Sequence, residues 1–382
     1  MRFDQVYQFN YPTTIRFGPG AVKELCDILK KNNLSRPLLV TDPIVSQLSF
    51  FSGIKEDLSR HGLSWEVFSD IHKNPVKSDV YKGTDIYDQT VRDCIVGIGG
   101  GAAIDVARAM VLRVFHREDL FKYDDLIGGD IFVTNEVPFF ITVPTTSGTG
   151  SEVGRSAIIA DDETHQKRIL FAPKLMAKVV LADPMLTMEL PPFITAATGM
   201  DALTHNVEAF LAKMPHPMSE GIALEGITLV HQYLRRAVNQ PDVASRSNML
   251  MASMMGAVAF QKGLGVVHSM AHPLSSLLDT HHGLANAVAI PYGLEFNISG
   301  FENKFKRIAR ALGLASETGE AVVKYMFELN SEIHIPLRMR DIGVKNEHIE
   351  TLADLAFADF AHPNNPKPVT REDFKRLYLK AL

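Results

Sequence analysis

The chain is organised around three stretches: Gly199-Met200-Asp201-Ala202-Leu203-Thr204-His205, then Gly263-Leu264-Gly265-Val266-Val267-His268-Ser269-Met270-Ala271-His272-Pro273, and then Thr280-His281-His282-Gly283. Seven of the 14 histidines fall between His205 and His282, about a fifth of the length, where an even distribution would place about three. This excess of imidazoles predicts a shared role for them.

The spacing of these residues indicates a metal site. Asp201 and His205 are four residues apart and would share one face of a helix, and His268 and His272 repeat that spacing. His282 stands just before a glycine in what reads as a turn. A carboxylate with several imidazoles suits Fe²⁺ or Zn²⁺, and the lack of a thiolate excludes a structural zinc site of the cysteine type. The alternative, helix-face histidines that bond to backbone, accounts less well for five such residues in three short segments.

The same three stretches resemble the signature of the iron-containing (group III) alcohol dehydrogenases. The resemblance extends from Phe17-Gly18-Pro19-Gly20 to about Phe296 and is weak beyond it. It implies a dehydroquinate synthase-like fold: an α/β N-terminal domain with a parallel, Rossmann-like dinucleotide-binding sheet, and an all-α C-terminal domain. The metal ligands that it implies are Asp201, His205, His268 and His282. His272 is not among them, and we place it beside the nicotinamide as a proton relay or orienting group.

Composition excludes several other classes of protein. The 382 residues, 46% hydrophobic and 22% charged, are globular in composition and long enough for two domains. The net charge of −5 and the lack of a basic stripe argue against nucleic-acid binding. No apolar run approaches the roughly 20 residues of a membrane span, and no signal core follows Met1. We expect Cys26 and Cys94 to be buried free thiols, as in the cytoplasm.

The first half alternates strands with helices, which predicts a parallel sheet in a domain of residues 1–184. The expected strands are 11–17, 37–42, 65–68, 94–98, 138–144, 156–160 and 176–181. The expected helices are 21–31, 47–62, 76–89 and 103–114.

A glycine run follows the strand at 94–98. Glycines at a strand-to-helix junction let backbone N–H groups approach a pyrophosphate, and the helix N-terminus adds partial positive charge. The alternative is an ordinary tight turn. The cofactor-binding candidates here are Gly99, Gly100, Gly101, Ala102 and Asp105. Compared with the family pattern, Ala102 replaces a serine and Arg108 a lysine, so a hydroxyl contact to phosphate is lost while the backbone cradle remains.

Asp42 closes the strand at 37–42. An acid at such a position accepts hydrogen bonds from the adenosine ribose and repels a 2′-phosphate, which favours NAD over NADP. The same residue, before Pro43, could merely begin a turn. The family resemblance favours the ribose role.

A second polar loop, residues 145–152, follows the strand at 138–144. It resembles the loop that family members place over the nicotinamide end of the cofactor, although a plain connector would have similar composition. Its cofactor-binding candidates are Thr145, Thr146, Thr149 and Ser151. Lys167 matches a family lysine that reaches the cofactor; by itself it would pass as a solvated lysine.

Helical periodicity dominates after Asp183-Pro184 and predicts an all-helical metal-binding domain, residues 185–382. A metal held there would lie in a cleft facing the glycine-rich domain. The expected helices are 195–213, 216–239, 243–259, 266–278, 304–311, 317–329 and 349–357, with a capped last helix from Thr370. Lys262, six residues before His268, is a candidate for binding a substrate carboxylate; the alternative is a surface lysine.

These features predict a metal-dependent, NAD-linked dehydrogenase that interconverts a primary alcohol, diol or hydroxy acid and its carbonyl product. Iron is preferred to zinc only through the resemblance, and a cytoplasmic homodimer or larger oligomer is expected. The alternatives are a zinc glycerol dehydrogenase, a 4-hydroxybutyrate-type dehydrogenase, a dehydroquinate synthase-type lyase and a non-catalytic metal or nucleotide sensor. The lyase would need a Lys and Arg cluster around residues 201–282, which is missing.

Overall fold

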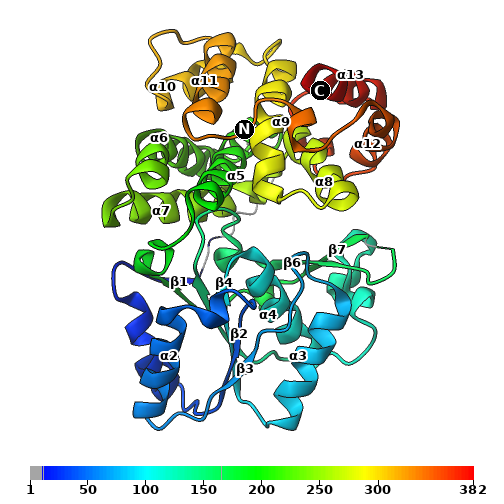
Figure 1. Ribbon diagram of the computed structural model, residues 1–382. Coiled ribbons are helices and arrows are strands. Elements are labelled where there is room, and N and C mark those ends of the chain that lie inside the picture. The colour runs from blue at the N-terminus through cyan, green and yellow to red at the C-terminus, as the bar shows by residue number, and fades with distance from the viewer. Residues whose placement is uncertain (1–10, 12, 165) are drawn as a thin grey trace. The chain divides into compact units, whose positions relative to one another are not determined.

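The computed structural model describes residues 11, 13–164 and 166–382. Contacts divide them into two compact units (Figure 1). One unit contains residues 13–146 and 150–187, and the other contains residues 147–149 and 188–382.

The first unit is built on a six-stranded sheet whose strand pairs are all parallel. Its order is β1-β8-β5-β4-β2-β3. The strands are β1 (Thr14–Phe17), β2 (Pro37–Val40), β3 (Glu66–Phe68), β4 (Cys94–Gly99), β5 (Phe139–Pro144) and β8 (Val179–Ala182). The central strands are apolar runs because helices cover both faces of such a sheet. The predicted parallel sheet is therefore confirmed. The strand predicted at 11–17 includes residue 12, which lies outside the described residues.

Four α-helices belong to this unit: α1 (Leu25–Lys31), α2 (Ser49–Arg60), α3 (Lys77–Gln89) and α4 (Gly101–Arg113). The helix expected at 21–31 begins instead as a 3-10 turn, Ala21–Glu24, because the carboxylate of Asp183 accepts hydrogen bonds from the N–H groups of Gly20 and Val22. The other predicted helices differ from the observed ones by a few residues at their ends.

An antiparallel ribbon of β6 (Ser156–Ala160) and β7 (Lys167–Phe171) completes the unit. The sequence predicted β6 but not β7, whose short Lys-Arg-Ile-Leu-Phe run has no clear alternation. Ser156 is paired with Phe171, and Ala160 with Lys167. Side chains of paired residues share one face of a ribbon, so Lys167 and Phe171 lie on the same face.

The described part of the second unit contains helices and no strand, which confirms the all-helical prediction. Its α-helices are α5 (Pro192–Leu211), α6 (Pro217–Asn239), α7 (Val243–Ala259), α8 (Val266–Leu278), α9 (His282–Asn297), α10 (Glu302–Ala311), α11 (Gly319–Glu332), α12 (Ile349–Phe357) and α13 (Arg371–Ala381). The predicted cap of α13 is present: Thr370 and Asp373 hydrogen-bond each other's backbone.

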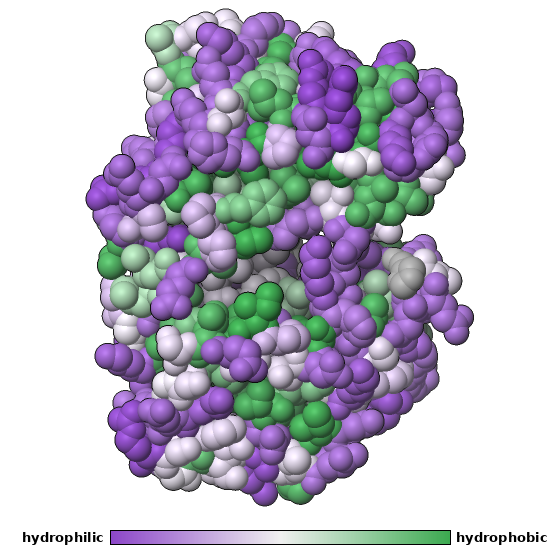
Figure 2. Space-filling view, in the orientation of Figure 1, coloured by the Kyte–Doolittle hydropathy of each residue, from purple (hydrophilic) through white to green (hydrophobic). Residues whose placement is uncertain are grey.

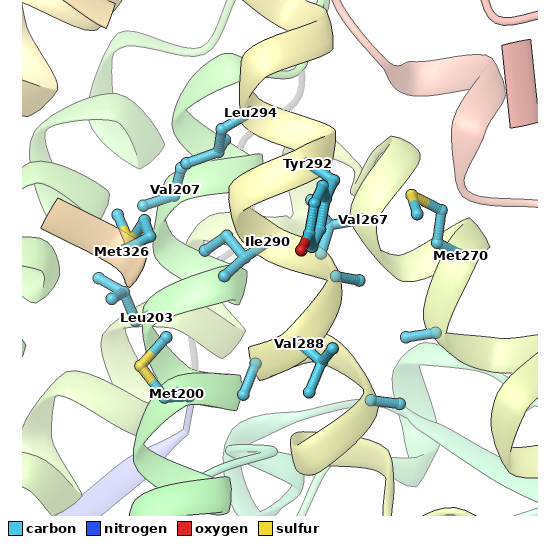
Figure 3. Packing of buried hydrophobic residues seen from close by; sticks show 14 of the residues in the cluster. Met200, Leu203, Val207, Val267, Met270, Val288, Ile290, Tyr292, Leu294 and Met326 are labelled. Carbon is cyan, nitrogen blue, oxygen red and sulfur yellow. The ribbon is translucent and has the colours of Figure 1, made fainter. Parts of the chain in front are cut away.

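Helix α9 was not predicted, and placing His282 in a turn was wrong, since His282 is the first residue of this helix. Nearly every side of α9 is buried, so its sequence lacks the polar stripe that marks a surface helix. Figure 3 shows why: α9 lies between α5 and α8, with Ile290 and Val288 on its two sides.

Cys26 and Cys94 are buried and free, as expected. Within the described residues, no single helix is long and apolar enough to cross a membrane; helices 243–262 and 266–278, bent by 108°, meet the length and composition criteria only as a pair. The face in Figure 2 mixes hydrophilic and hydrophobic side chains.

Candidate metal centre and cofactor cradle

Helix α5 carries the first two residues of the centre. Asp201 and His205 follow one another by one turn, as the sequence predicted, and both are buried. Asn206, on the same helix, donates hydrogen bonds to the carbonyls of Ala202 and Ala252, which fixes α5 against α7.

A glycine brings the start of α9 against α5. A Cβ on Gly283 would lie 2.4 Å from the carbonyl oxygen of Ala197 and 3.3 Å from Cβ of Asp201. Only glycine therefore allows this approach. The approach places His282, the preceding residue, with its Nε2 3.5 Å from Oδ1 of Asp201.

Helix α8 supplies His268, and a buried carboxylate orients its ring. Nδ1 of His268 lies 2.6 Å from Oε2 of Glu208, which also accepts the backbone N–H groups of Gly265, Val267 and His268. Glu208 therefore satisfies the first turn of α8 while directing Nε2 of His268 the other way. Burial raises the pKa of Glu208 to about 7, and burial lowers that of His268, which keeps the ring neutral, as metal binding requires.

The four predicted ligands converge on one point. Asp201, His205, His268 and His282 each offer a ligand atom, and these atoms lie within 4.8 Å of one another. Burial alone would raise the pKa of Asp201, but the neighbouring His205, His282 and His268 lower it to about 2, so the carboxylate is ionised.

Asn286 shows where the ligand lone pairs point. Its Nδ2 lies 2.8 Å from Oδ1 of Asp201, 3.3 Å from Nε2 of His268 and 3.1 Å from Nε2 of His282. Three acceptors from three helices thus aim at one small region. One carboxylate and three imidazoles suit Fe²⁺ or Zn²⁺ in number and type, so these residues fit a divalent ion.

His272 lies beside the cluster, and its orientation is fixed from a distant segment. Its Nδ1 lies 2.7 Å from Oδ2 of Asp359, and its ring stacks on His282 and on Phe360. The hydroxyl of Ser269 donates to the other oxygen of Asp359 at 2.6 Å. His281, which could exchange roles with His282, is the N-cap residue of α9 and is not in the four-residue cluster.

The glycine run forms the turn between β4 and α4. Gly99 has a φ of +152°, which few other residues adopt, and a Cβ there would lie 2.7 Å from Cβ of Ala103. Gly100 is the N-cap residue of α4, followed by Gly101 and Ala102 in its first turn. The open backbone and helix N-terminus fit a pyrophosphate.

Asp42 follows β2, the strand next to β4, at the point where the strand order reverses. Its Oδ1 accepts the N–H groups of Ile44 and Val45, which is the turn role considered above. Its Oδ2 is 3.4 Å from the position of a Cβ on Gly99, so the second oxygen lies beside the glycine turn.

The loop at 145–152 is tied to the same turn. Thr145 donates its N–H to Gly99, and the Thr146 side chain lies against Gly100. Ser151 and Asp105 are joined by a 2.6 Å hydrogen bond, and the buried Arg108 guanidinium contacts both. Asp105 and Ser151 thus connect this loop to α4. Thr149 lies with residues 147–149 in the helical unit, and Lys167 begins β7.

The carboxylate-binding role considered for Lys262 is wrong. The side chain is buried, and its Nζ donates to Oε1 of Glu220 and to the carbonyl of Phe210, both at 2.9 Å. Burial, then the nearby Lys304, lowers the pKa of Lys262 to about 8. Its ammonium is consumed by packing contacts between α5, α6 and the end of α7.

Three residues of the centre escaped the sequence analysis. Glu208 had a usable signal, because Asp201, His205 and Glu208 follow the i, i+4, i+7 pattern of one helix face. Asn286 stands four residues after His282, but that spacing has meaning only once α9 is known to be a helix. Asp359 had no local signal.

Comparison with known proteins follows the same division of the chain. The family model "Iron-containing alcohol dehydrogenase" matches residues 12–184, and "Fe-containing alcohol dehydrogenase family, C-terminal" matches residues 195–382. The chain is 36% identical to 4-hydroxybutyrate dehydrogenase of Cupriavidus necator, covering 97% of this chain and 99% of that protein. A crystal structure of 1,3-propanediol oxidoreductase superposes with a TM-score of 0.95 at 30% identity, covering 99% and 100% of the two chains. Sulfoacetaldehyde reductase of Bifidobacterium kashiwanohense, solved in complex with NAD⁺, gives 0.87 at 26% identity, covering 99% of each chain.

Proposed function

Because this chain belongs to the iron-containing alcohol dehydrogenase family, we propose that Asp201, His205, His268 and His282 bind the divalent ion of an NAD-linked dehydrogenase. The chain is an oxidoreductase that acts on CH–OH groups. The observation that carries the metal assignment is the convergence of these four side chains within 4.8 Å.

The bound ion would supply Lewis acidity, which lowers the pKa of an alcohol hydroxyl. The surrounding residues prepare for this. Glu208 keeps His268 in the tautomer whose Nε2 carries a lone pair. Asp359 does the same for His272, so we assign His272 the transfer of the hydroxyl proton through its Nε2.

We assign the dinucleotide to the turn after β4. The backbone of Gly99, Gly100, Gly101 and Ala102 would bind the pyrophosphate, and the free edge of the Asp42 carboxylate the adenosine ribose. Thr145, Thr146, Thr149 and Lys167 would contact the nicotinamide half, with Asp105 and Ser151 holding the loop in place. The nicotinamide would supply the hydride acceptor. Asp42 favours NAD over NADP, because a 2′-phosphate would meet its negative charge.

Among substrates, we propose a hydroxy acid of the 4-hydroxybutyrate type. The support is the 36% identity to a 4-hydroxybutyrate dehydrogenase over nearly the whole of both chains. Diols and simple alcohols are the comparison substrates, because other relatives carry those names. We further propose iron rather than zinc, a cytoplasmic location and a homo-oligomer.

The function is tested with purified protein, NAD⁺ or NADP⁺, and a panel of 4-hydroxybutyrate, 1,4-butanediol, 1-butanol and glycerol. Absorbance of the reduced cofactor reports turnover, and elemental analysis identifies the ion. We expect metal-dependent reduction of NAD⁺ with 4-hydroxybutyrate as the best substrate. Absence of turnover with both Fe²⁺ and Zn²⁺ supplied would favour the sensor or lyase and refute the proposal.

A further inference from the structure

Arg155 is the residue that stands out once Lys262 is removed from consideration. It lies between the loop at 145–152 and β6, and its side chain is partly buried. No described carboxylate lies within ion-pair distance of it, and its guanidinium donates to no described acceptor. Its contact is the ring of Phe171, whose centroid is 5.2 Å from Cζ.

Other partly or fully buried cations of the same unit are neutralised or fully bonded. Arg108 contacts Asp105 and several carbonyls, and Arg168, on the same ribbon, pairs with Asp124 at 3.3 Å. Burial lowers the pKa of Arg155, and no carboxylate opposes that effect. A desolvated guanidinium without a counter-charge is costly, and an anionic ligand would offset the cost.

The ribbon register indicates the surface that this guanidinium occupies. Phe171, over which it lies, shares a face with Lys167, the residue assigned to the nicotinamide half of the cofactor. Arg155 is four residues from Ser151, which is bonded to the first turns of α4 through Asp105. The guanidinium is therefore held next to the cofactor-binding segments of its own unit.

We propose that Arg155 binds the carboxylate of the hydroxy-acid substrate and is the residue that selects acids over neutral alcohols. This inference rests on the proposed function. A guanidinium suits the task because its planar donors match the two oxygens of a carboxylate. The aromatic ring of Phe171 holds the cation without neutralising it.

The test compares Arg155→Ala, Arg155→Gln and Arg155→Lys with wild type on 4-hydroxybutyrate and 1,4-butanediol, which differ at one end only. We expect the ratio of kcat/KM for acid to that for diol to fall about 10- to 100-fold in the alanine and glutamine variants, mainly through KM. Arg155→Lys should retain part of the ratio. Arg60→Ala, which removes an exposed cation of the same unit (side chain 70% exposed), is the control and should leave the ratio unchanged.

A separate measurement identifies the source of the anion. Dissociation constants for NADH are measured by fluorescence, and melting temperatures establish that the variants are folded. An equal loss on both substrates, with NADH binding weakened tenfold or more, would show that Arg155 binds a cofactor phosphate and would overturn the inference. An unchanged acid-to-diol ratio in folded variants would overturn it as well. If wild type oxidises neither substrate, the proposed function itself fails.

Discussion

Nδ1 of His272 lies 2.7 Å from Oδ2 of Asp359, although the two residues are 87 positions apart. The same carboxylate accepts a hydrogen bond from Ser269, on the helix that carries His272, and from the N–H of Ala361. These contacts hold Asp359 in the ionised state, with a pKa well below its usual range despite its burial. Asp359 therefore fixes both the ring plane and the tautomer of His272.

Asp359→Asn should lower kcat about tenfold or more, because an amide can place its N–H against Nδ1 and favour the wrong tautomer. The measurement is steady-state kinetics with metal content determined on the same sample. Asp354→Asn, at an exposed ion pair on α12, is the matched control and should behave as wild type. A kcat equal to wild type at full metal occupancy would contradict the role given to His272.

Glu208→Gln should weaken metal binding about 10- to 100-fold, since the carboxylate orients His268 and increases its basicity. The experiment is competition with a chelator of known affinity, followed by metal analysis. Glu225→Gln, at an exposed position of α6, is the control. Unaltered affinity in a folded Glu208→Gln protein would show that α8 alone orients the ring.

Lys262→Met should lower the free energy of unfolding by about 1–3 kcal/mol, because the carbonyl of Phe210 and the carboxylate of Glu220 each lose a buried donor. The loss is moderated because Lys304 and Arg307 still contact Glu220. Urea denaturation provides the measurement. The acid-to-diol ratio of kcat/KM should not change; a selective loss of activity on acids at unchanged stability would restore the substrate role for Lys262.

Glu152 should make stability fall as the pH rises from 4.5 to 7. Burial raises its pKa to about 7, although Arg108 acts in the opposite direction. Below pH 4.5 the acid is protonated in both the folded and the unfolded chain. Between 4.5 and 7 the unfolded chain loses this proton and the folded chain keeps it, so the folded state loses on the order of 3 kcal/mol.

Glu152→Gln removes this titration. The variant should gain stability relative to wild type as the pH rises from 5 to 8, and the difference should level off above about 7. Urea unfolding at several pH values measures it, with Glu163→Gln, at an exposed turn, as the control. A stability difference that does not vary with pH would refute the buried, protonated state of Glu152.

The sequence by itself determined the two-part architecture and the four clustered side chains. Buried parallel strands are apolar runs, and helix partners such as Asp201 and His205 recur at i+4, so both leave local patterns. The glycine turn after β4 was also legible, because a φ of +152° at Gly99 is accessible to few other residues.

Only the tertiary structure decided what surrounds those residues. Helix α9 is apolar on all sides because it is enclosed by neighbours, so no periodicity marked it, and Asn286 was missed with it. Asp359 reaches His272 across 87 residues, and whether Lys262 or Arg155 has a partner depends on helices and strands remote in sequence. Local spacing specifies which side chains share a helix face, whereas the pairing of charges is settled by which elements pack together.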